Sequence, residues 1–282
     1  MRAIWRGIVS TPIIHPNKKV LKMLKGRIVV ITGSTAGVGF GAAKAALEAE
    51  AKVFIHGPTV DAVEQASIEL GGVPGLAADL TWPEAGGNII EAALAAYGRI
   101  DAVVNNAGIY PRADLPQTDA AFFDHVFSIN ARAPMLVAQR AVAAFKAQGE
   151  PGAIVNIGSV NAYAGGTNLL AYSMSKGALM TMTRNLAEAY AVDLIRVNQL
   201  NLGWVLTETE KVIQRQEGRP EGWYLDLPKQ IAPIGGLLTP ELVAKHILFW
   251  ASEASAPVTG QVYEVTQTPF LGRAGGGPLA RG

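Results

Sequence analysis

Residues 28–39 read Ile-Val-Val-Ile-Thr-Gly-Ser-Thr-Ala-Gly-Val-Gly, an apolar run that leads directly into a glycine-rich turn. The run Ile28–Ile31 is apolar at every position, which is typical of a parallel strand buried on both faces. The turn carries Gly33, Gly37 and Gly39, and an alanine-rich helical stretch follows it. Glycines let the backbone approach a ligand closely, and the N–H groups at a helix start bind phosphate. Strand, turn and helix in this order therefore predict a pyrophosphate-binding unit of a dinucleotide site.

The composition indicates a globular enzyme of small molecules. Hydrophobic residues make up 49% of the 282 positions and charged residues 17%, below the roughly 25% typical of globular domains. The net charge of +1 and the lack of a basic stripe argue against a nucleic-acid partner. The lack of cysteine excludes disulfides and thiolate chemistry. No apolar run approaches the ~20 residues that span a bilayer, and residues 1–15 lack a signal-peptide pattern, so we expect no membrane partner and a cytoplasmic location.

Short β-branched runs alternate with helical stretches along most of the chain. This alternation predicts an α/β protein with a three-layer Rossmann fold, in which a doubly wound, seven-stranded parallel sheet forms a single domain. The expected strands are Arg27–Thr32, Lys52–Gly57, Val73–Ala77, Asp101–Asn105, Gly152–Gly158, Leu194–Leu200 and Gln261–Val265. The expected helices are Val38–Glu50, Val60–Leu70, Pro83–Tyr97, Ala121–Gln148, Ala171–Tyr190 and Pro240–Ser252.

Three segments interrupt this alternation. Residues 1–25 precede the first strand and are interpreted as an N-terminal extension to a domain at 26–268. Residues 204–238 are rich in Trp, Gly and Pro, and a loop this long in a compact domain predicts a substrate lid. The Gly- and Pro-rich residues 269–282 predict a flexible tail.

Tyr172 and Lys176 lie four residues apart on an expected helix and therefore share one face. An ammonium beside a phenol favours the phenolate, so such a pair can exchange a proton with an alcohol or a carbonyl. On its own, the pair could equally be a surface lysine beside a half-buried tyrosine. Ser159 ends an expected strand thirteen residues earlier, where its hydroxyl could hold a substrate oxygen or merely cap the next turn. Asn130 interrupts an apolar helix and predicts a kink or a backbone–water role.

Together, Asn130, Ser159, Tyr172 and Lys176 resemble the Asn–Ser–Tyr–Lys tetrad of the short-chain dehydrogenase/reductase (SDR) family, and the resemblance covers about residues 25–265. The Gly-x-x-x-Gly-x-Gly turn, Asp79-Leu80, the stretch 105–108 (Asn-Asn-Ala-Gly) and the stretch 196–198 (Arg-Val-Asn) also match. The resemblance implies that Tyr172 is the acid/base and that Ser159 polarises the carbonyl. It also implies that Lys176 lowers the pKa of Tyr172 and binds the nicotinamide ribose, that Asn130 holds a water, and that no metal is needed.

The resemblance also implies a set of cofactor contacts. One departure is Leu202, which stands before Gly203 where the family usually has proline and removes a fixed φ from that turn. The expected cofactor residues are Gly33, Ser34, Thr35, Gly37, Val38, Gly39, His56, Thr59, Asp79, Leu80, Asn106, Ala107, Gly108, Tyr172, Lys176, Gly203 and Thr207.

The second expected strand ends without an acid, in the stretch 53–59 (Val-Phe-Ile-His-Gly-Pro-Thr). An acid there would bind the ribose hydroxyls and select NAD. Without it, His56, Thr59 and Ser34 could accept a 2′-phosphate, so NADP(H) is favoured and NAD(H) remains possible.

The expected substrate-binding residues are Ser159, Tyr163, Tyr172 and Trp204. Trp204, Trp223 and Tyr224 either pack the lid against the domain or line an apolar pocket. The family resemblance implies that helices 121–148 and 171–190 pair across a two-fold axis in a homodimer or homotetramer.

The function predicted from these residues is an NAD(P)-dependent interconversion of a secondary alcohol and a ketone, as in an alcohol dehydrogenase or carbonyl reductase. One alternative is an epimerase or dehydratase on the same scaffold. Another is a cofactor-binding protein without catalysis, although such a protein would be expected to lose Tyr172 or Lys176.

Overall fold

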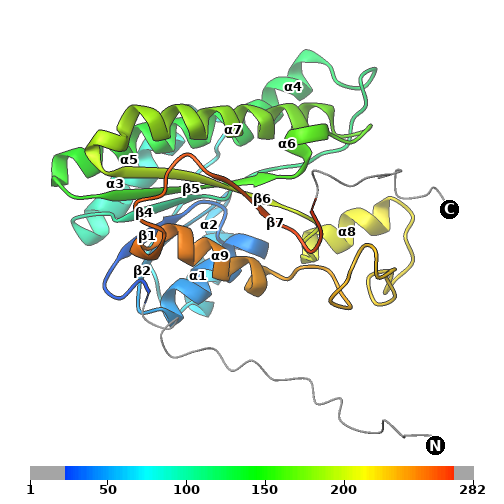
Figure 1. Ribbon diagram of the computed structural model, residues 1–282, viewed down its shortest axis with the longest axis horizontal. Helices are drawn as coiled ribbons and strands as arrows, with labels where there is room; N and C mark the ends of the chain where they lie inside the picture. Colours follow the sequence, from blue (N-terminus) through cyan, green and yellow to red (C-terminus); the bar gives the residue numbers. More distant parts are fainter. Residues whose placement is uncertain (1–22, 270–282) are drawn as a thin grey trace, which may run out of the picture.

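The computed structural model describes residues 23–269, and its centre is one seven-stranded, all-parallel sheet (Figure 1). The strand order is β3-β2-β1-β4-β5-β6-β7, which is the predicted doubly wound topology. The strands are β1 (Ile28–Ile31), β2 (Lys52–Gly57), β3 (Gly75–Ala77), β4 (Ala102–Asn105), β5 (Gly152–Ser159), β6 (Ile195–Leu202) and β7 (Val262–Val265).

Helices cover both faces of this sheet (Figure 1). One apolar core joins the sheet to α1 (Gly37–Glu48), α2 (Val60–Glu69) and α9 (Pro240–Ala251). A second core, on the other face, joins it to α3 (Ala85–Tyr97), α5 (Ala133–Gln148) and α7 (Leu170–Tyr190).

The burial of β1 explains its uninterrupted apolar sequence. Side chains along a strand alternate between the two faces of the sheet. Accordingly, Val29 and Ile31 belong to one core, whereas Ile28 and Val30 belong to the other. A strand with this sequence is stable only between two helical layers.

Successive strands from β1 to β3 are added on one side of β1, and the strands from β4 onward are added on its other side. Strand β1 therefore pairs with both β2 and β4. In open α/β sheets, ligands bind at the carboxyl ends of the strands at such a switch point. The turn after β1 and the segment after β4 therefore flank the expected site.

The helix predicted over 121–148 is divided in the structure. It consists of α4 (Ala120–Phe127), a π-helical turn at Ser128–Arg132 and then α5. Inserted π-turns bend helices and often occur at functional sites. Of the kink and the backbone–water role predicted for Asn130, the π-turn shows that the regular helix is interrupted at this residue.

The segment 204–238 is less irregular than its sequence indicated. It contains α8 (Glu208–Gln216), and a short α6 (Asn161–Ala164) was also missed elsewhere in the chain. A parallel bridge between Val205 and Leu238 brings the two ends of the segment together. The segment therefore leaves the carboxyl edge of the sheet and returns to nearly the same place (Figure 1).

Two expectations fall mostly outside the described residues: the N-terminal extension at 1–25 and the tail at 269–282. Between residues 23 and 269, no helix is long and apolar enough to cross a bilayer.

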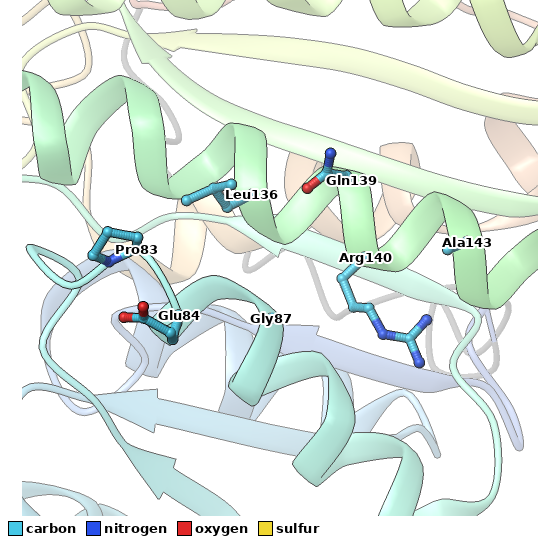
Figure 2. A pocket seen from close by; sticks show the side chains of 7 residues that line it. All are labelled: Pro83, Glu84, Gly87, Leu136, Gln139, Arg140 and Ala143. Atoms are coloured by element: carbon cyan, nitrogen blue, oxygen red, sulfur yellow. The ribbon is translucent and has the colours of Figure 1, made fainter.

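A groove of about 320 Å³ lies between α3 and α5 (Figure 2). Its lining residues are Pro83, Glu84, Gly87, Leu136, Gln139, Arg140 and Ala143. None of the predicted catalytic or cofactor residues lies in it. Its guanidinium, that of Arg140, already pairs with Glu91, so the groove is not the candidate active site.

Candidate active site

The turn after β1 requires glycine for two reasons. Gly33 and Gly37 have φ values of +61° and +54°, in the left-handed region that disfavours residues with a side chain. A Cβ on Gly39 would lie 2.2 Å from the Gly33 carbonyl oxygen and 2.4 Å from Asn106 Nδ2. The turn is therefore a close-packed cradle of backbone.

The N-terminus of α1 is open to an anion. Side chains of Thr59, Asp119, Thr207 and Thr239 cap α2, α4, α8 and α9, respectively. Helix α1 has no side-chain cap and no acidic residue in its first turn. Its unpaired N–H groups and positive dipole end therefore suit the pyrophosphate of a dinucleotide, and the residues present fit such a cofactor.

The segment after β4 holds the turn in place. The Asn106 amide donates to the carbonyl oxygens of Thr32 and Gly33, both at 2.9 Å. The Ala107 backbone approaches so closely that a Cβ on Gly33 would lie 2.8 Å from its Cα. Asn106 thus acts on the cofactor site at least in part by fixing the turn.

Gly108 and Thr207 connect the cofactor turn to the rest of the site. A Cβ on Gly108 would lie 3.2 Å from Asn130 Oδ1 and 3.3 Å from Lys176 Nζ. The methyl group of Thr207 lies 3.4 Å from the Cβ position of Gly37. Gly108, after β4, therefore lies beside Asn130 and Lys176, and Thr207, at the start of α8, lies beside the cofactor turn.

His56 and Ser34 are placed differently from what the sequence indicated. His56 is buried, and its Nδ1 accepts the Gly33 N–H at 3.0 Å while its Nε2 lies 3.0 Å from the Ala78 carbonyl oxygen. The Ser34 hydroxyl is also buried and donates to the Ile31 carbonyl oxygen at 2.7 Å. Both side chains use their polar atoms inside the protein, so they shape the turn and cannot receive a 2′-phosphate in this arrangement.

Gly203 follows β6 and donates its N–H to the Val265 carbonyl oxygen at 3.0 Å. The remaining predicted cofactor residues lie in or near the turns that follow β1, β2 and β3. Val38 is half-buried in the first turn of α1. Thr35 packs against Gly57, and exposed Thr59 accepts the Ala62 N–H as the cap of α2. Exposed Asp79 accepts the Thr81 N–H at 2.8 Å, whereas Leu80 is buried in the core.

The structure brings Ser159, Tyr172 and Lys176 together at the carboxyl edge of the sheet. Ser159 is the last residue of β5, and its hydroxyl hydrogen-bonds to the phenolic oxygen of Tyr172. It also accepts the Asn161 N–H at 3.2 Å, so the turn-capping role and the site role coexist. Lys176 lies one turn after Tyr172 on α7, and its Nζ is 5.8 Å from the centre of the phenol ring.

Burial raises the pKa of Tyr172 above its ordinary value, while the Ser159 hydrogen bond and the Arg112 guanidinium oppose that rise. The resemblance had assigned the lowering of this pKa to Lys176. Arg112 is a further cation that lowers it, in addition to Lys176, whose Nζ is 5.8 Å from the ring centre. A phenol held protonated at neutral pH is suited to donate a proton to a carbonyl oxygen.

Asn130 sits in the π-turn, fully buried, and fastens the segment after β4 to α7. Its Oδ1 accepts the Ile109 N–H at 2.8 Å, and its Nδ2 donates to the Ile109 carbonyl oxygen at 2.7 Å and to Ser175 Oγ at 3.1 Å. Its side chain is therefore a positioning group beside Lys176.

Lys176 is buried, and its Nζ donates to the Ile157 carbonyl oxygen at 2.9 Å. Burial lowers the pKa of Lys176 to about 8. The folded state therefore binds fewer protons than the unfolded chain between about pH 8 and pH 10.4, and stability must rise with pH across that window.

We expect the free energy of unfolding of the wild type, relative to Lys176→Met, to rise by about 2 kcal/mol from about pH 7 to about pH 9.5. Denaturant unfolding of both proteins at the two pH values measures this difference. Exposed Lys245→Met is the control and should show no such change. If the wild type and Lys176→Met differ in the free energy of unfolding by the same amount at both pH values, burial does not lower the pKa of Lys176.

The aromatic residues of the segment 204–238 pack on one another. Trp204 stacks on Trp223 with ring centres 5.0 Å apart, and Trp223 meets Tyr224 edge-on at 5.7 Å. The Trp204 indole N–H donates to Glu210 Oε1 at 2.8 Å. Half-buried Tyr163 lies on α6, which packs against α7.

Three residues close to Tyr172 were not predicted as site residues. Tyr110 is tilted against Tyr172 with ring centres 6.1 Å apart, and burial raises the pKa of Tyr110 to about 12. Arg112 and buried Glu210 both act electrostatically on Tyr172. Tyr110 could have been suspected because it lies two residues after the Asn-Asn-Ala-Gly stretch ends, but nothing in the sequence distinguishes Glu210 from a surface acid.

Comparisons with known proteins agree with this geometry. Residues 33–267 match the family model described as enoyl-(acyl carrier protein) reductase. The chain is 33% identical over 247 residues to 2-(S)-hydroxypropyl-CoM dehydrogenase 3 of Xanthobacter autotrophicus, covering 86% of this chain and 96% of the relative.

Two solved structures share the fold over nearly the whole domain. A protein from Beutenbergia cavernae, described as a putative NAD(P) dependent gluconate 5-dehydrogenase with bound NADP at low occupancy, has a TM-score of 0.77 and 34% identity, covering 86% of this chain and 96% of that one. L-sorbose reductase from Gluconobacter frateurii, complexed with NADPH and L-sorbose, has a TM-score of 0.80 and 26% identity, covering 87% and 97%. The chain therefore belongs to the short-chain dehydrogenase/reductase family of NAD(P)-dependent oxidoreductases.

Proposed function

We propose that this oxidoreductase is a carbonyl reductase in which Tyr172 is the acid/base. The observation that carries the proposal is the Ser159–Tyr172 hydrogen bond beside buried Lys176, at the carboxyl edge of the sheet next to the open end of α1. No group of three His, Asp or Glu side chains that could hold a metal occurs between residues 23 and 269.

The proton and the charge are handled by residues of the chain. Ser159 and Tyr172 both direct hydroxyl groups at the place where a substrate oxygen would bind, and Tyr172 donates its proton as that oxygen gains electrons. Lys176, with a pKa near 8, carries positive charge at neutral pH and stabilises the resulting phenolate. The nicotinamide, when bound, exchanges a hydride with the substrate carbon.

The cofactor we propose is NADP(H). The end of β2 carries no carboxylate that would repel a 2′-phosphate, and a Cβ on Gly57 would lie 2.4 Å from the Thr35 methyl group, so an acid there would not fit without movement. The structures from Beutenbergia cavernae and Gluconobacter frateurii contain NADP and NADPH. Three residues were predicted to accept the 2′-phosphate: His56, Thr59 and Ser34. His56 and Ser34 are buried, whereas Thr59 is exposed and stays a candidate.

The substrate we propose is a small ketone that carries several hydroxyl groups. Two of the similar proteins are named for polyhydroxylated compounds: L-sorbose, which is such a ketone, and gluconate, a hydroxy acid whose oxidation at C5 gives one. The segment 204–238 would act as the lid, because its two ends meet at the Val205–Leu238 bridge and α8 supplies Glu210 beside Tyr172. Its tryptophans stack on each other within the segment.

Absorbance at 340 nm with NADPH or NADH and a panel of hydroxyketones tests the function. We expect turnover, with a lower KM for NADPH than for NADH. Failure to oxidise either cofactor with any member of a broad panel, despite measured cofactor binding, would favour the silent binding protein. A strong preference for NADH would contradict the cofactor proposal alone.

We also propose that the protein is a homodimer or homotetramer built on α5 and α7. These helices lie on the same face of the sheet (Figure 1). Each exposes a methionine, Met135 on α5 and Met174 on α7. We expect light scattering at micromolar concentration to give two or four times the mass of one chain. Replacing both methionines with glutamate should lower that mass, and a monomeric wild type would contradict the proposal.

A further inference from the structure

A charged cluster, which we call the charged wall, comes from two separate segments, and two of its members, Arg112 and Glu210, act electrostatically on Tyr172. Arg112 follows β4, whereas Glu210 and Glu217 lie on and just after α8. Arg112 Nε donates to Glu217 Oε1 at 2.6 Å, and its Nη1 donates to the Tyr110 carbonyl oxygen at 3.1 Å. Two contacts therefore fix the guanidinium.

Glu210 lies deeper than the ion pair. It is 7% exposed, accepts the Trp204 indole N–H, and interacts electrostatically with Arg112, Glu217 and Tyr172. Burial raises the pKa of Glu210. Its carboxyl group thus lies in a region of low dielectric, where charges act strongly on one another.

The charges of this wall leave no attraction for an anion. One guanidinium faces two carboxyl groups, so the wall carries one net negative charge, or none when Glu210 is protonated. An anionic group beside Tyr172 would have to displace Glu217 from Arg112 and would also meet Glu210. Like charges brought together discriminate between ligands, most strongly where solvent is excluded, as it is at buried Glu210 but not at exposed Glu217.

We infer that the site selects a neutral, hydroxyl-bearing ketone over the same ketone with a carboxylate, and that Glu217 and Glu210 exclude the anion. The inference rests on the proposed ketone reduction at Tyr172 and narrows its substrate class. By this inference the substrate resembles L-sorbose, which is neutral and for which the Gluconobacter frateurii relative is named. It does not resemble gluconate, which is an anion and for which the Beutenbergia cavernae relative is named.

Besides buried Lys176, whose positive charge lies beside Tyr172, Arg219 is an exposed cation that would favour the opposite result. It is exposed and lies 5.4 Å and 5.1 Å from the ring centres of Trp204 and Trp223. It forms no salt bridge with another residue in the range 23–269. Recognition of an anion would therefore depend on Arg219, which the experiment must vary separately.

L-sorbose and 5-keto-D-gluconate provide a matched pair, because they differ only in a terminal hydroxymethyl group or carboxylate. We expect kcat/KM with NADPH to be about tenfold or more higher for L-sorbose. Glu217→Gln frees Arg112 and should reduce that ratio about tenfold, mainly through KM for the anion. Glu210→Gln should shift the ratio in the same direction. Glu150→Gln is the control, an exposed acid just before β5, at the opposite end of that strand from Ser159.

A wild type that prefers 5-keto-D-gluconate would overturn the inference, as would an unchanged ratio in Glu217→Gln. If Arg219→Gln abolishes that preference for the anion, Arg219 is the recognising group instead. Quenching of tryptophan fluorescence gives affinities without turnover. Quenching by L-sorbose at lower concentration than by 5-keto-D-gluconate, without reduction of either, would refute the proposed function and support the selectivity. Quenching by neither compound would overturn the inference.

Discussion

Replacing Tyr172 with phenylalanine should lower kcat by about 10³- to 10⁴-fold while leaving the Kd for NADPH nearly unchanged. The substitution removes one oxygen and keeps the ring that packs against Tyr110 at 6.1 Å. The substrate oxygen then loses its proton donor, and Ser159 loses its partner. Steady-state turnover and cofactor titration by fluorescence measure the two quantities separately.

Tyr190→Phe is a matched control for this result. Tyr190 is the last residue of α7, the helix that carries Tyr172, and its ring lies under the ammonium of Lys146 at 5.9 Å. Removing its hydroxyl should leave kcat within about twofold of the wild type. Near-normal turnover in Tyr172→Phe would transfer the proton-donor role to another group. A parallel loss of NADPH binding would instead indicate a structural defect.

Local pattern was sufficient to predict the parts of this protein that depend on nearest neighbours. The strands and the phosphate turn follow from apolar runs and glycines, and the kink at Asn130 follows from a polar residue that disfavours helix interiors. The tetrad residues were recognised because their order and spacing resemble the tetrad of the short-chain dehydrogenase/reductase family. The strands, the turn and the interruption at Asn130 need only the chain within a few residues, whereas the tetrad needed the family resemblance.

The errors arose where tertiary contacts decide how a polar side chain is used. His56 resembled a ligand contact at a strand end, yet its ring turns inward and bridges Gly33 and Ala78. Glu210 lies in α8, a helix of mostly polar residues, so its burial beside Trp204 is not encoded in any local period. Packing between distant segments determines both outcomes.

Gly39→Ala should weaken NADPH and NADH binding roughly ten- to hundredfold and lower the free energy of unfolding by about 1–3 kcal/mol. The added methyl group would lie 2.2 Å from the Gly33 carbonyl oxygen, which belongs to the backbone and cannot rotate away as a side chain would. The turn must therefore open or release Asn106, and either change displaces the N–H groups offered to the pyrophosphate.

Gly87→Ala separates this effect from the general consequence of adding a methyl group to a helix. Gly87 lies inside α3, and its Cβ would meet nothing within 4 Å. Alanine there should raise stability by about 0.5–1 kcal/mol, since it reduces the freedom of the unfolded chain. The two variants therefore move stability in opposite directions, and only Gly39→Ala should change the Kd. If Gly39→Ala loses stability but binds both cofactors as the wild type does, the turn after β1 is a packing element and the pyrophosphate lies elsewhere. Because α1 has neither a capping side chain nor an acid in its first turn, we expect the Kd to change.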